Sequence, residues 1–213
     1  SDQVYVPCVS KIQPSKLHGM LPVMSFKAPA VMSPTDMRTS ARPLDCFLGR
    51  ISRYNNADVN DDILKSCLET MKLNWISNLD RMYRPRKLTM QEAIGGIPGY
   101  LSSLKVSTSP GFPVVKLLKF KGKSGCFQFK PEGGVEIQDW FEMAVRNRLD
   151  DMAKGTHPVN RFLVFWKDEL VSPNKIIEAK TRAIYCNDVI SLVAFRVLFG
   201  MTVAAINNSY LTT

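Results

Sequence analysis

The sequence lacks the residue clusters on which metal-binding and secreted proteins depend. The five cysteines are odd in number and scattered: Cys8, Cys46, Cys67, Cys126 and Cys186. They form no Cys-x-x-Cys pair, and the two histidines, His18 and His157, stand far apart in the chain. We therefore expect no zinc site, and free thiols in a reducing compartment. The amino terminus has no basic segment followed by an apolar run, so we expect no secretory signal.

The chain also lacks a balance of charge. It has 28 Lys and Arg residues against 19 Asp and Glu residues, which gives a formal net charge of +9 over 213 residues. Basic side chains that neutralise phosphates release condensed counterions, so this excess favours a polyanionic partner such as nucleic acid. A merely basic soluble protein would have the same balance. The apolar fraction of 45% indicates a folded chain and argues against disorder.

Only one long hydrophobic run is present, at 189–206. Its length is at the lower limit for a membrane-spanning helix. Arg196 lies in its middle, where a charge costs about 2.5–3.5 kcal/mol even on the lenient insertion scale. A helix buried in a large core has the same composition, so we predict a buried helix over 189–206.

Residues 1–58 contain six widely spaced prolines: Pro7, Pro14, Pro22, Pro29, Pro34 and Pro43. Because proline interrupts helices, this spacing predicts an extended strap that lies over other elements. From Val59 apolar residues recur at helical spacing, with Asn60 or Asp61 as the cap and Pro85 at the end. Thr89 with Glu92 then predicts a capping box.

The middle of the chain alternates basic and aromatic residues. The sequence Thr-Ser-Pro-Gly-Phe-Pro at 108–113 predicts a rigid turn, and residues 114–130 predict a hairpin that turns at 122–125. The lysines of this basic hairpin are Lys116, Lys119, Lys121, Lys123 and Lys130. An amphipathic helix follows at 140–149, and apolar segments at 163–166 and 183–185 predict a strand pair.

Residues 165–182 place Lys167, Lys175, Lys180 and Arg182 between the two predicted strands. Cations presented from a strand pair can converge on a triphosphate, and an arginine adds a planar fork that grips phosphate. Asp168 and Glu169 are expected to keep the cations ordered through ion pairs when no ligand is present. On composition alone, a solvated charged hairpin is the favoured interpretation of the segment.

The sequence Lys-Asp-Glu-Leu, a lysine eight residues after Lys167, and then Lys-Thr-Arg resembles motif F of picornavirus-like RNA-dependent RNA polymerases. The helix that follows, with Val-Ala-Phe-Arg at 193–196, is similar to the family's continuation. The turn at 108–113 resembles motif G, and the proline-rich residues 14–34 resemble the amino-terminal strap of insect-virus and algal-virus members. The family carries motif F on the fingertips, above the nucleotide entry tunnel.

The resemblance implies nucleotide-binding roles for Lys167, Lys175, Lys180 and Arg182, of which Lys167 and Arg182 contact the triphosphate. It also implies that template RNA lies along Thr108, Ser109 and Gly111, and we assign Lys116 and Lys119 to the same template side. Glycine and small hydroxyl residues would let the phosphate backbone approach closely. This chain departs from many relatives in two places: Val171 replaces an arginine and Phe112 replaces a tyrosine.

The fold class implied is α+β: the fingers region of a right-hand polymerase, with an extended strap at 1–58 and fingers at 59–213. The family takes its catalytic aspartates from motif A and a Gly-Asp-Asp turn, and this sequence contains no Gly-Asp-Asp. We therefore expect the palm catalytic motifs and the thumb to be absent from this chain. No catalytic or metal-binding residue is predicted here, and Mg²⁺ or Mn²⁺ is expected to act in the full-length enzyme.

Expected partners are viral template and primer RNA, nucleoside triphosphates, and the palm and thumb of the polymerase. Exposed apolar surface would also promote self-association. The expected location is the host cytoplasm, at membrane-associated replication complexes. Two alternatives come from other classes: a non-catalytic RNA-binding module that uses the hairpin at 114–130, and a membrane-associated replication scaffold anchored by residues 189–206.

The missing carboxylates generate the first prediction. Purified residues 1–213 are expected to incorporate no nucleotide into RNA, because nothing in them would hold the two metal ions at the reacting phosphate. The measurement is primer extension with labelled nucleotide in Mg²⁺ or Mn²⁺. Incorporation above a no-enzyme control would contradict the prediction.

Overall fold

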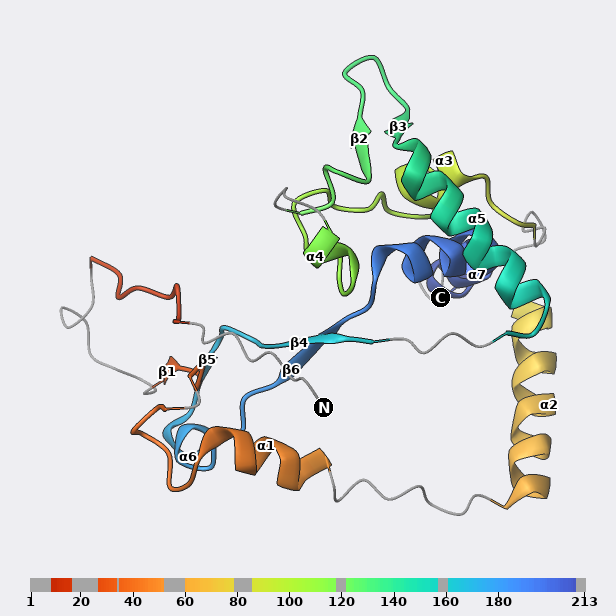
Figure 1. The fold of residues 1–213 in the computed structure, drawn as a ribbon. Helices are drawn as coiled ribbons and strands as arrows, with labels where there is room; N and C mark the ends of the chain where they lie inside the picture. The colour runs from red at the N-terminus through yellow and green to blue at the C-terminus, as the bar shows by residue number, and fades with distance from the viewer. Residues whose placement is uncertain are drawn as a thin grey trace. The chain divides into compact units, whose positions relative to one another are not determined.

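The computed structural model describes residues 9–16, 27–33, 35–51, 60–78, 86–117, 122–156 and 161–209 (Figure 1). Contacts divide the chain into two compact units, the first made of residues 1–58 and 164–185 and the second of residues 59–163 and 186–213. The sequence prediction placed residues 165–182 with the second part of the chain. In the structure they group with the amino-terminal segment.

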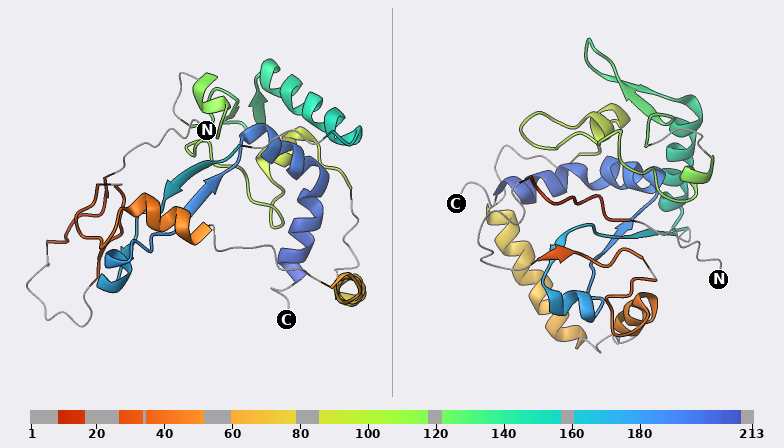
Figure 2. Two further views of the ribbon diagram at one scale, coloured as in Figure 1. Left: turned by 60° about the horizontal axis from the view of Figure 1, so that its bottom comes forward. Right: turned by 90° about the vertical axis from the view of Figure 1, so that its left-hand side faces the viewer.

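The first unit pairs short strands from distant parts of the sequence. β1 (Ala28–Pro29) runs antiparallel to β5 (Leu170–Val171), with Ala28 opposite Val171 (Figures 1 and 2). β4 (Leu163–Trp166) pairs with β6 (Ala183–Cys186), as the sequence predicted. The buried core of this unit consists of Ala30, Val31, Met32, Trp166, Val171 and Ile176. The amino-terminal segment and residues 164–185 are therefore packed as one body.

Helix α1 (Pro43–Ile51) lies within residues 1–58, where the proline spacing predicted an extended strap without long helices. Pro43 occupies the first helical position, where its missing N–H is harmless because first-turn N–H groups have no partner within the helix. Asp45 in the first turn and Arg50 in the last turn complement the helix dipole. Spaced prolines prevent long helices, but they permit a short helix that begins at a proline.

In the second unit, α3 (Met90–Gly95) begins with the predicted capping box. The Thr89 hydroxyl accepts a hydrogen bond from Glu92 N at 3.2 Å, and the Glu92 carboxylate accepts one from Thr89 N at 2.9 Å. The Arg86 guanidinium also donates to this carboxylate at 2.8 Å. The hydrogen bond from Arg86, followed by that from Thr89 N, lowers the pKa of Glu92 to about 2. The start of α3 is therefore fixed at several points.

The hairpin of the second unit lies further along the chain than predicted. β2 (Phe127–Phe129) and β3 (Val135–Ile137) pair antiparallel, with Phe129 opposite Val135, so the turn occupies 130–134. The predicted hairpin at 114–130 is therefore wrong, and α4 (Val114–Leu117) forms where its first strand was expected. The sequence Pro-Glu-Gly-Gly at 131–134 makes up most of this turn.

The main core lies between α5 (Asp139–Ala153) and α7 (Val189–Ser209), with α3 against α7. Phe141 and Val145, one helical turn apart on α5, are fully buried. The core residues are Leu88, Ala93, Ile94, Val114, Cys126, Phe127, Val135, Phe141, Val145, Val189, Val193, Ala194 and Val197. The mixed fold of helices and short strands agrees with the predicted α+β class.

Helix α7 is buried along one face and exposed along the other. Val189, Val193 and Ala194 are fully buried, whereas Phe195 and Phe199 are 47% and 45% exposed and their rings stack at 5.0 Å. The prediction of a buried helix thus holds for one face. The segment Val189–Asn208 is also long and apolar enough to cross a membrane by length and composition, a property that core helices of soluble proteins share.

Arg196 in the middle of α7 is accommodated by backbone carbonyl groups. Its Nε donates to Ala93 O at 2.5 Å and its Nη2 donates to Ser102 O at 2.6 Å. Burial lowers the pKa of this guanidinium from its ordinary value. The charge therefore satisfies carbonyl oxygens in α3 and the loop after it, which explains an arginine within an apolar helix.

Helix α2 (Asp61–Asn78) is capped by Asn60. The side-chain oxygen of Asn60 accepts hydrogen bonds from Asp62 N and Ile63 N at 2.9 and 3.2 Å. The cap confirms one of the two predicted starts. Among the side chains of α2 that the structure describes, the apolar ones that predicted the helix are exposed: Ile63 by 62% and Leu68 by 46%. Helical periodicity therefore located this helix without indicating its partner.

The arginine in α7 gives a stability prediction. Replacing Arg196 with Met is expected to lower the free energy of unfolding by about 2 kcal/mol, because the part-buried Ala93 O and the exposed Ser102 O both lose a charged donor. Urea denaturation of residues 1–213, followed by circular dichroism, measures the change. The matched control is Arg146→Met on α5, which breaks an exposed ion pair with Glu142 and should cost below ~0.5 kcal/mol. Equal effects of the two substitutions would contradict the assignment.

Candidate functional site

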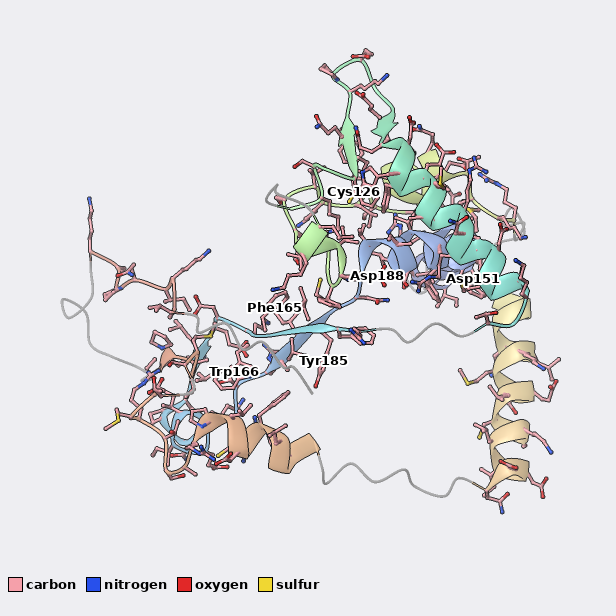
Figure 3. All side chains as sticks on the ribbon, in the orientation of Figure 1. Cys126, Asp151, Phe165, Trp166, Tyr185 and Asp188 are labelled. Atoms are coloured by element: carbon pink, nitrogen blue, oxygen red, sulfur yellow. The ribbon has the colours of Figure 1, made fainter. Side chains whose placement is uncertain are left out.

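The segment that carries the predicted nucleotide-binding cations runs from β4 through β5 and α6 (Pro173–Ile177) to β6. Lys167 follows β4 and Arg182 precedes β6, and Lys167 N donates to Arg182 O at 2.8 Å. The strand pair carries Phe165 and Trp166 on β4 and Tyr185 on β6 (Figure 3). Strand pairing therefore brings together two residues that are distant in sequence.

Glu169 joins the side chains of these two residues. Its carboxylate accepts a hydrogen bond from Arg182 Nε at 2.8 Å and forms an ion pair with Lys167 Nζ at 3.4 Å. A further bond from Arg182 Nη2 makes the arginine contact two-pronged. The guanidinium of Arg182 holds the pKa of Glu169 at about 2, and Glu169 in turn raises the pKa of Arg182.

Asp168 has different contacts from its neighbour. It was expected to pair with the cations, but its carboxylate accepts hydrogen bonds from Ser10 Oγ and Lys11 N, both at 2.7 Å. Successive residues of an extended chain point to opposite sides. Asp168 therefore holds the amino-terminal segment, while Glu169 faces the cations.

Lys175 and Lys180 form a second group around α6. Lys180 N donates to Lys175 O at 2.7 Å, and the Lys180 ammonium pairs with Glu178. Both lysines are exposed. Among the described contacts, none joins the side chains of this group to those of Lys167 and Arg182.

The amino-terminal segment fixes the turn that follows α6. Ala179 has a φ of 48°, which is uncommon for a residue with a Cβ. Arg50 Nη1 donates to Ala179 O at 2.9 Å, Ser40 Oγ donates to Ile177 O at 3.0 Å, and the buried Thr181 hydroxyl donates to Val31 O at 2.9 Å. Sequence reasoning missed Arg50 and Ser40, because nothing local to them indicates these distant partners.

The template-side residues lie on a turn in the second unit that is tied to the start of α7. Val189 N donates to Pro110 O at 2.8 Å, and Gly111 N donates to the Ser109 hydroxyl at 3.2 Å. The Thr108 hydroxyl donates to Lys105 O at 2.9 Å. Both hydroxyl groups are thus engaged within the turn.

Gly111 has a structural requirement that the sequence did not indicate. Its φ is 76°, and a Cβ at this position would lie 2.3 Å from Asn187 O. The absence of a side chain therefore allows the turn to approach the backbone just before α7. The Cys186–Asp188 segment that it meets also contains Asp188, whose side chain caps α7 by accepting from Ser191 N at 2.8 Å.

Two further lysines were assigned to the template side. Lys116 is exposed on α4, five residues after Gly111 in the chain. Lys119 lies outside the described residues. Lys123 was predicted only as part of a hairpin, yet it is 5% exposed and its ammonium contacts Thr108. The sequence carried no signal of that burial.

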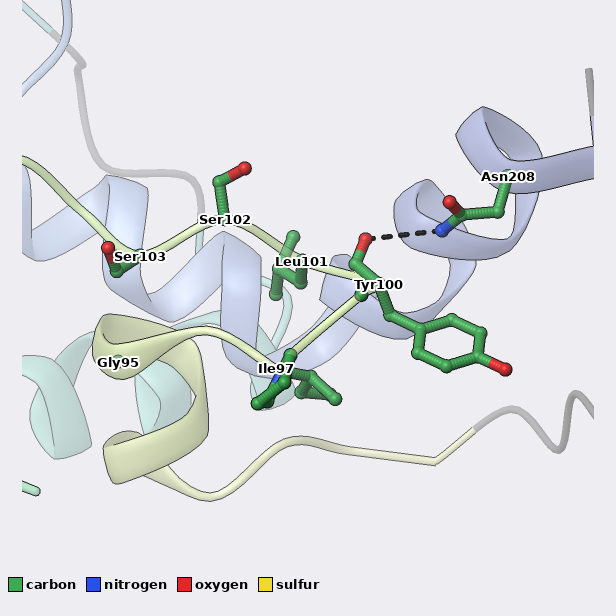
Figure 4. Close-up of a pocket in the computed structure, with 9 residues that line it drawn as sticks. Gly95, Ile97, Tyr100, Leu101, Ser102, Ser103 and Asn208 are labelled. Carbon is green, nitrogen blue, oxygen red and sulfur yellow. Dashed lines mark hydrogen bonds between the residues drawn. The ribbon is translucent and has the colours of Figure 1, made fainter. Parts of the chain in front are cut away.

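A shallow cavity of about 490 Å³ lies away from these residues, between the loop at 95–103 and the end of α7 (Figure 4). Asn208 Nδ2 donates to Tyr100 O at 3.2 Å across it. None of the predicted site residues lines this cavity. In the described part of the chain, no group of three or more His, Cys, Asp and Glu residues is placed to hold a metal ion.

Comparison with known proteins identifies the class to which this arrangement belongs. Residues 22–210 match the family described as viral RNA-dependent RNA polymerase, and the chain therefore belongs to that family. Within it, the similarity is to picornavirus proteins, as the residues at 165–182 had suggested.

The relatives are much longer than this chain. The genome polyprotein of human rhinovirus C (strain C15) is 26% identical over 200 residues, which are 93% of this chain and 8% of the polyprotein. That of Ljunganvirus 1 is 28% identical over 205 residues, 95% of this chain and 9% of the polyprotein. The solved structure of the Sicinivirus 3Dpol RNA-dependent RNA polymerase matches with a TM-score of 0.72 at 28% identity. The match covers 94% of this chain and 39% of that one.

The Glu169 bridge generates a prediction about protonation. In an Arg182→Gln variant the pKa of Glu169 should rise from about 2 toward its ordinary value near 4.5. Because the folded-state pKa is depressed, the stabilisation by this carboxylate is present above about pH 4.5. It is lost as the pH falls toward 2. An NMR titration of the Glu169 side-chain carboxyl carbon measures the shift.

Lys180→Gln is the matched control, because Lys180 pairs with Glu178 and should leave the pKa of Glu169 unchanged. A pKa for Glu169 that stays near 2 without Arg182 would show that the guanidinium is not its cause.

Proposed function

We propose that this chain is the fingers portion of a viral RNA-directed RNA polymerase that replicates an RNA genome. Its part is to position incoming nucleoside triphosphates and to guide template RNA. The main support for the proposal is that the Glu169 carboxylate pairs with both Lys167 and Arg182, in a chain that belongs to the polymerase family. The match covers 39% of the length of the solved relative, so RNA synthesis by the whole enzyme is likewise a proposal.

The nucleotide-binding role rests on the way the cations are held. Arg182 is exposed and Lys167 is half-buried, so both can reach a ligand. Their shared partner is a single carboxylate. A triphosphate carries several negative oxygens, so it offers more charge-assisted hydrogen bonds than Glu169 and can replace it. Lys175 and Lys180 would add to the same positive field.

The template-guiding role rests on the rigid turn at 108–111, whose backbone is fixed to α7 and beside which Lys116 is exposed. Contacts with phosphate and sugar position a strand without reading its sequence, which suits an enzyme that must copy any template. Divalent metal ions are proposed to act in the whole polymerase, where they would activate and stabilise the reacting oxygens. The palm and thumb are proposed as the partners that complete the enzyme.

A non-catalytic RNA-binding module remains the second candidate, but the structure removes its main support. The basic hairpin at 114–130 does not form, and Phe127 is fully buried in the core rather than available for base stacking. The third candidate, a membrane-anchored scaffold, needs α7 outside the protein. Its buried face packs instead against α3 and α5.

The experiment uses the full-length polymerase that contains these residues. Lys167→Met and Arg182→Met should each raise the KM for nucleoside triphosphate about tenfold or more, because a charge-assisted contact with phosphate is lost. The Kd for template RNA should stay within about twofold, since the template side lies elsewhere. Primer extension and fluorescence anisotropy measure the two quantities.

Lys130→Met, at the β2–β3 turn, removes the same charge and is expected to leave the nucleotide KM unchanged. If variants of Lys116, Lys119 and Lys121 abolish RNA binding while Lys167 and Arg182 variants use nucleotide normally, the RNA-binding module is the better description.

A further inference from the structure

Lys123 is the one buried lysine in the part of the chain that the structure describes. Its exposed fraction is 5%, and it lies in the loop between α4 and β2. Gly122 brings this loop against the residues before the template-side turn. Its φ is 75°, and a Cβ there would lie 2.4 Å from Val106 O. Lys123 N then donates to Val106 O at 2.6 Å, so the loop and the turn are in direct backbone contact.

The ammonium group of Lys123 points at the turn. Its Nζ donates to the Thr108 hydroxyl, to Thr108 O at 3.2 Å and to Lys105 O at 3.5 Å. The Thr108 hydroxyl gives its own proton to Lys105 O, so it must accept from Lys123. A protonated lysine has three N–H groups, enough to serve all three acceptors. The contacts of Lys123 are therefore suited to a charged ammonium group.

No carboxylate accompanies that charge in the described part of the chain. The titratable groups that act on Lys123 are the thiols of Cys186 and Cys126. Burial raises the pKa of Cys126 to about 11, so this thiol is neutral at pH 7. Burial has the opposite effect on a cation, and it lowers the pKa of Lys123. A lysine that only held its loop against the turn would not need to be charged. Burying a charge without an oppositely charged partner is costly, so an anion outside the chain would account for this charge.

We propose that Lys123 is a positioning residue for single-stranded template RNA, which holds the Thr108 turn in place and supplies positive charge behind it. The phosphodiester backbone is the ligand class, because the turn presents backbone and small side chains and offers no base-reading group. A buried charge is screened less by salt than an exposed one, so its field reaches a phosphate on the turn's outer side. This inference rests on the proposed template-guiding role of residues 108–111.

The test measures the Kd of the full-length polymerase for a single-stranded RNA oligonucleotide over a range of salt concentrations. Lys123→Met should weaken binding about tenfold and reduce the slope of log K against log salt by about 0.7, the share of one phosphate on a single strand. Lys123→Arg should keep the slope, because the charge stays. Lys154→Met, at the exposed end of α5, removes the same charge and should change neither value.

Thr108→Val separates positioning from charge, and it keeps the test decisive should Lys123→Met fail to fold. It removes the hydroxyl acceptor, so RNA affinity should fall severalfold with an unchanged salt slope. The proposal is overturned if Lys123→Met folds and leaves the salt slope unchanged, or if Lys123→Arg loses the slope. It is equally overturned if Thr108→Val binds RNA normally.

Failure of the template assignment itself gives a different result. Gly111→Ala forces the turn away from Asn187 and should weaken RNA binding whatever Lys123 does. If Gly111→Ala, Thr108→Val and Lys123→Met all bind RNA normally, the turn at 108–111 is not on the template side. If only Gly111→Ala weakens binding, the template assignment stands and the role of Lys123 is refuted.

Discussion

The hydrogen bond from Val189 N to Pro110 O is the constraint on which the second unit depends. It ties the turn at 108–111 to the first turn of α7, whose position is fixed by the core between α7, α5 and α3. Arg196 extends the same arrangement by holding the carbonyl groups at the end of α3. A turn that lacks secondary structure of its own thus gains the rigidity of a helical core, which is the usual way in which loops acquire defined functional geometry.

Elements with local signals were predictable from sequence. The Thr89–Glu92 capping box, α5 and the β4–β6 pair each follow from a few neighbouring residues. The hairpin was not, because the glycines at 122–125 and those at 133–134 are equally good turn signals. The choice between them depends on Lys123 N meeting Val106 O, a contact made only in the folded chain. Periodicity likewise located α2 but could not show that its apolar side chains stay exposed.

The candidate site, too, was only partly predictable from the sequence. The cations at 165–182 and the family resemblance were visible in the sequence, since spacing carries both. Which acid holds them was not visible, because Asp168 and Glu169 differ only in the side of the strand that each faces. The purpose of Gly111 and the burial of Lys123 were also hidden, as both depend on segments distant in sequence. Chemical type is a local property, whereas orientation and burial belong to the tertiary structure.

The carboxylate of Glu169 has a consequence for which ligands can enter. The Glu169 carboxylate already neutralises part of the charge of Lys167 and Arg182. Any anion that binds these two cations must therefore take the place of that carboxylate. Such an exchange is nearly balanced for a singly charged anion and strongly favourable for a triphosphate. Under the proposed nucleotide-binding role, Glu169 is a competitor that an entering triphosphate has to displace. Chloride, with a single charge, and uncharged nucleosides would displace it less readily than a triphosphate.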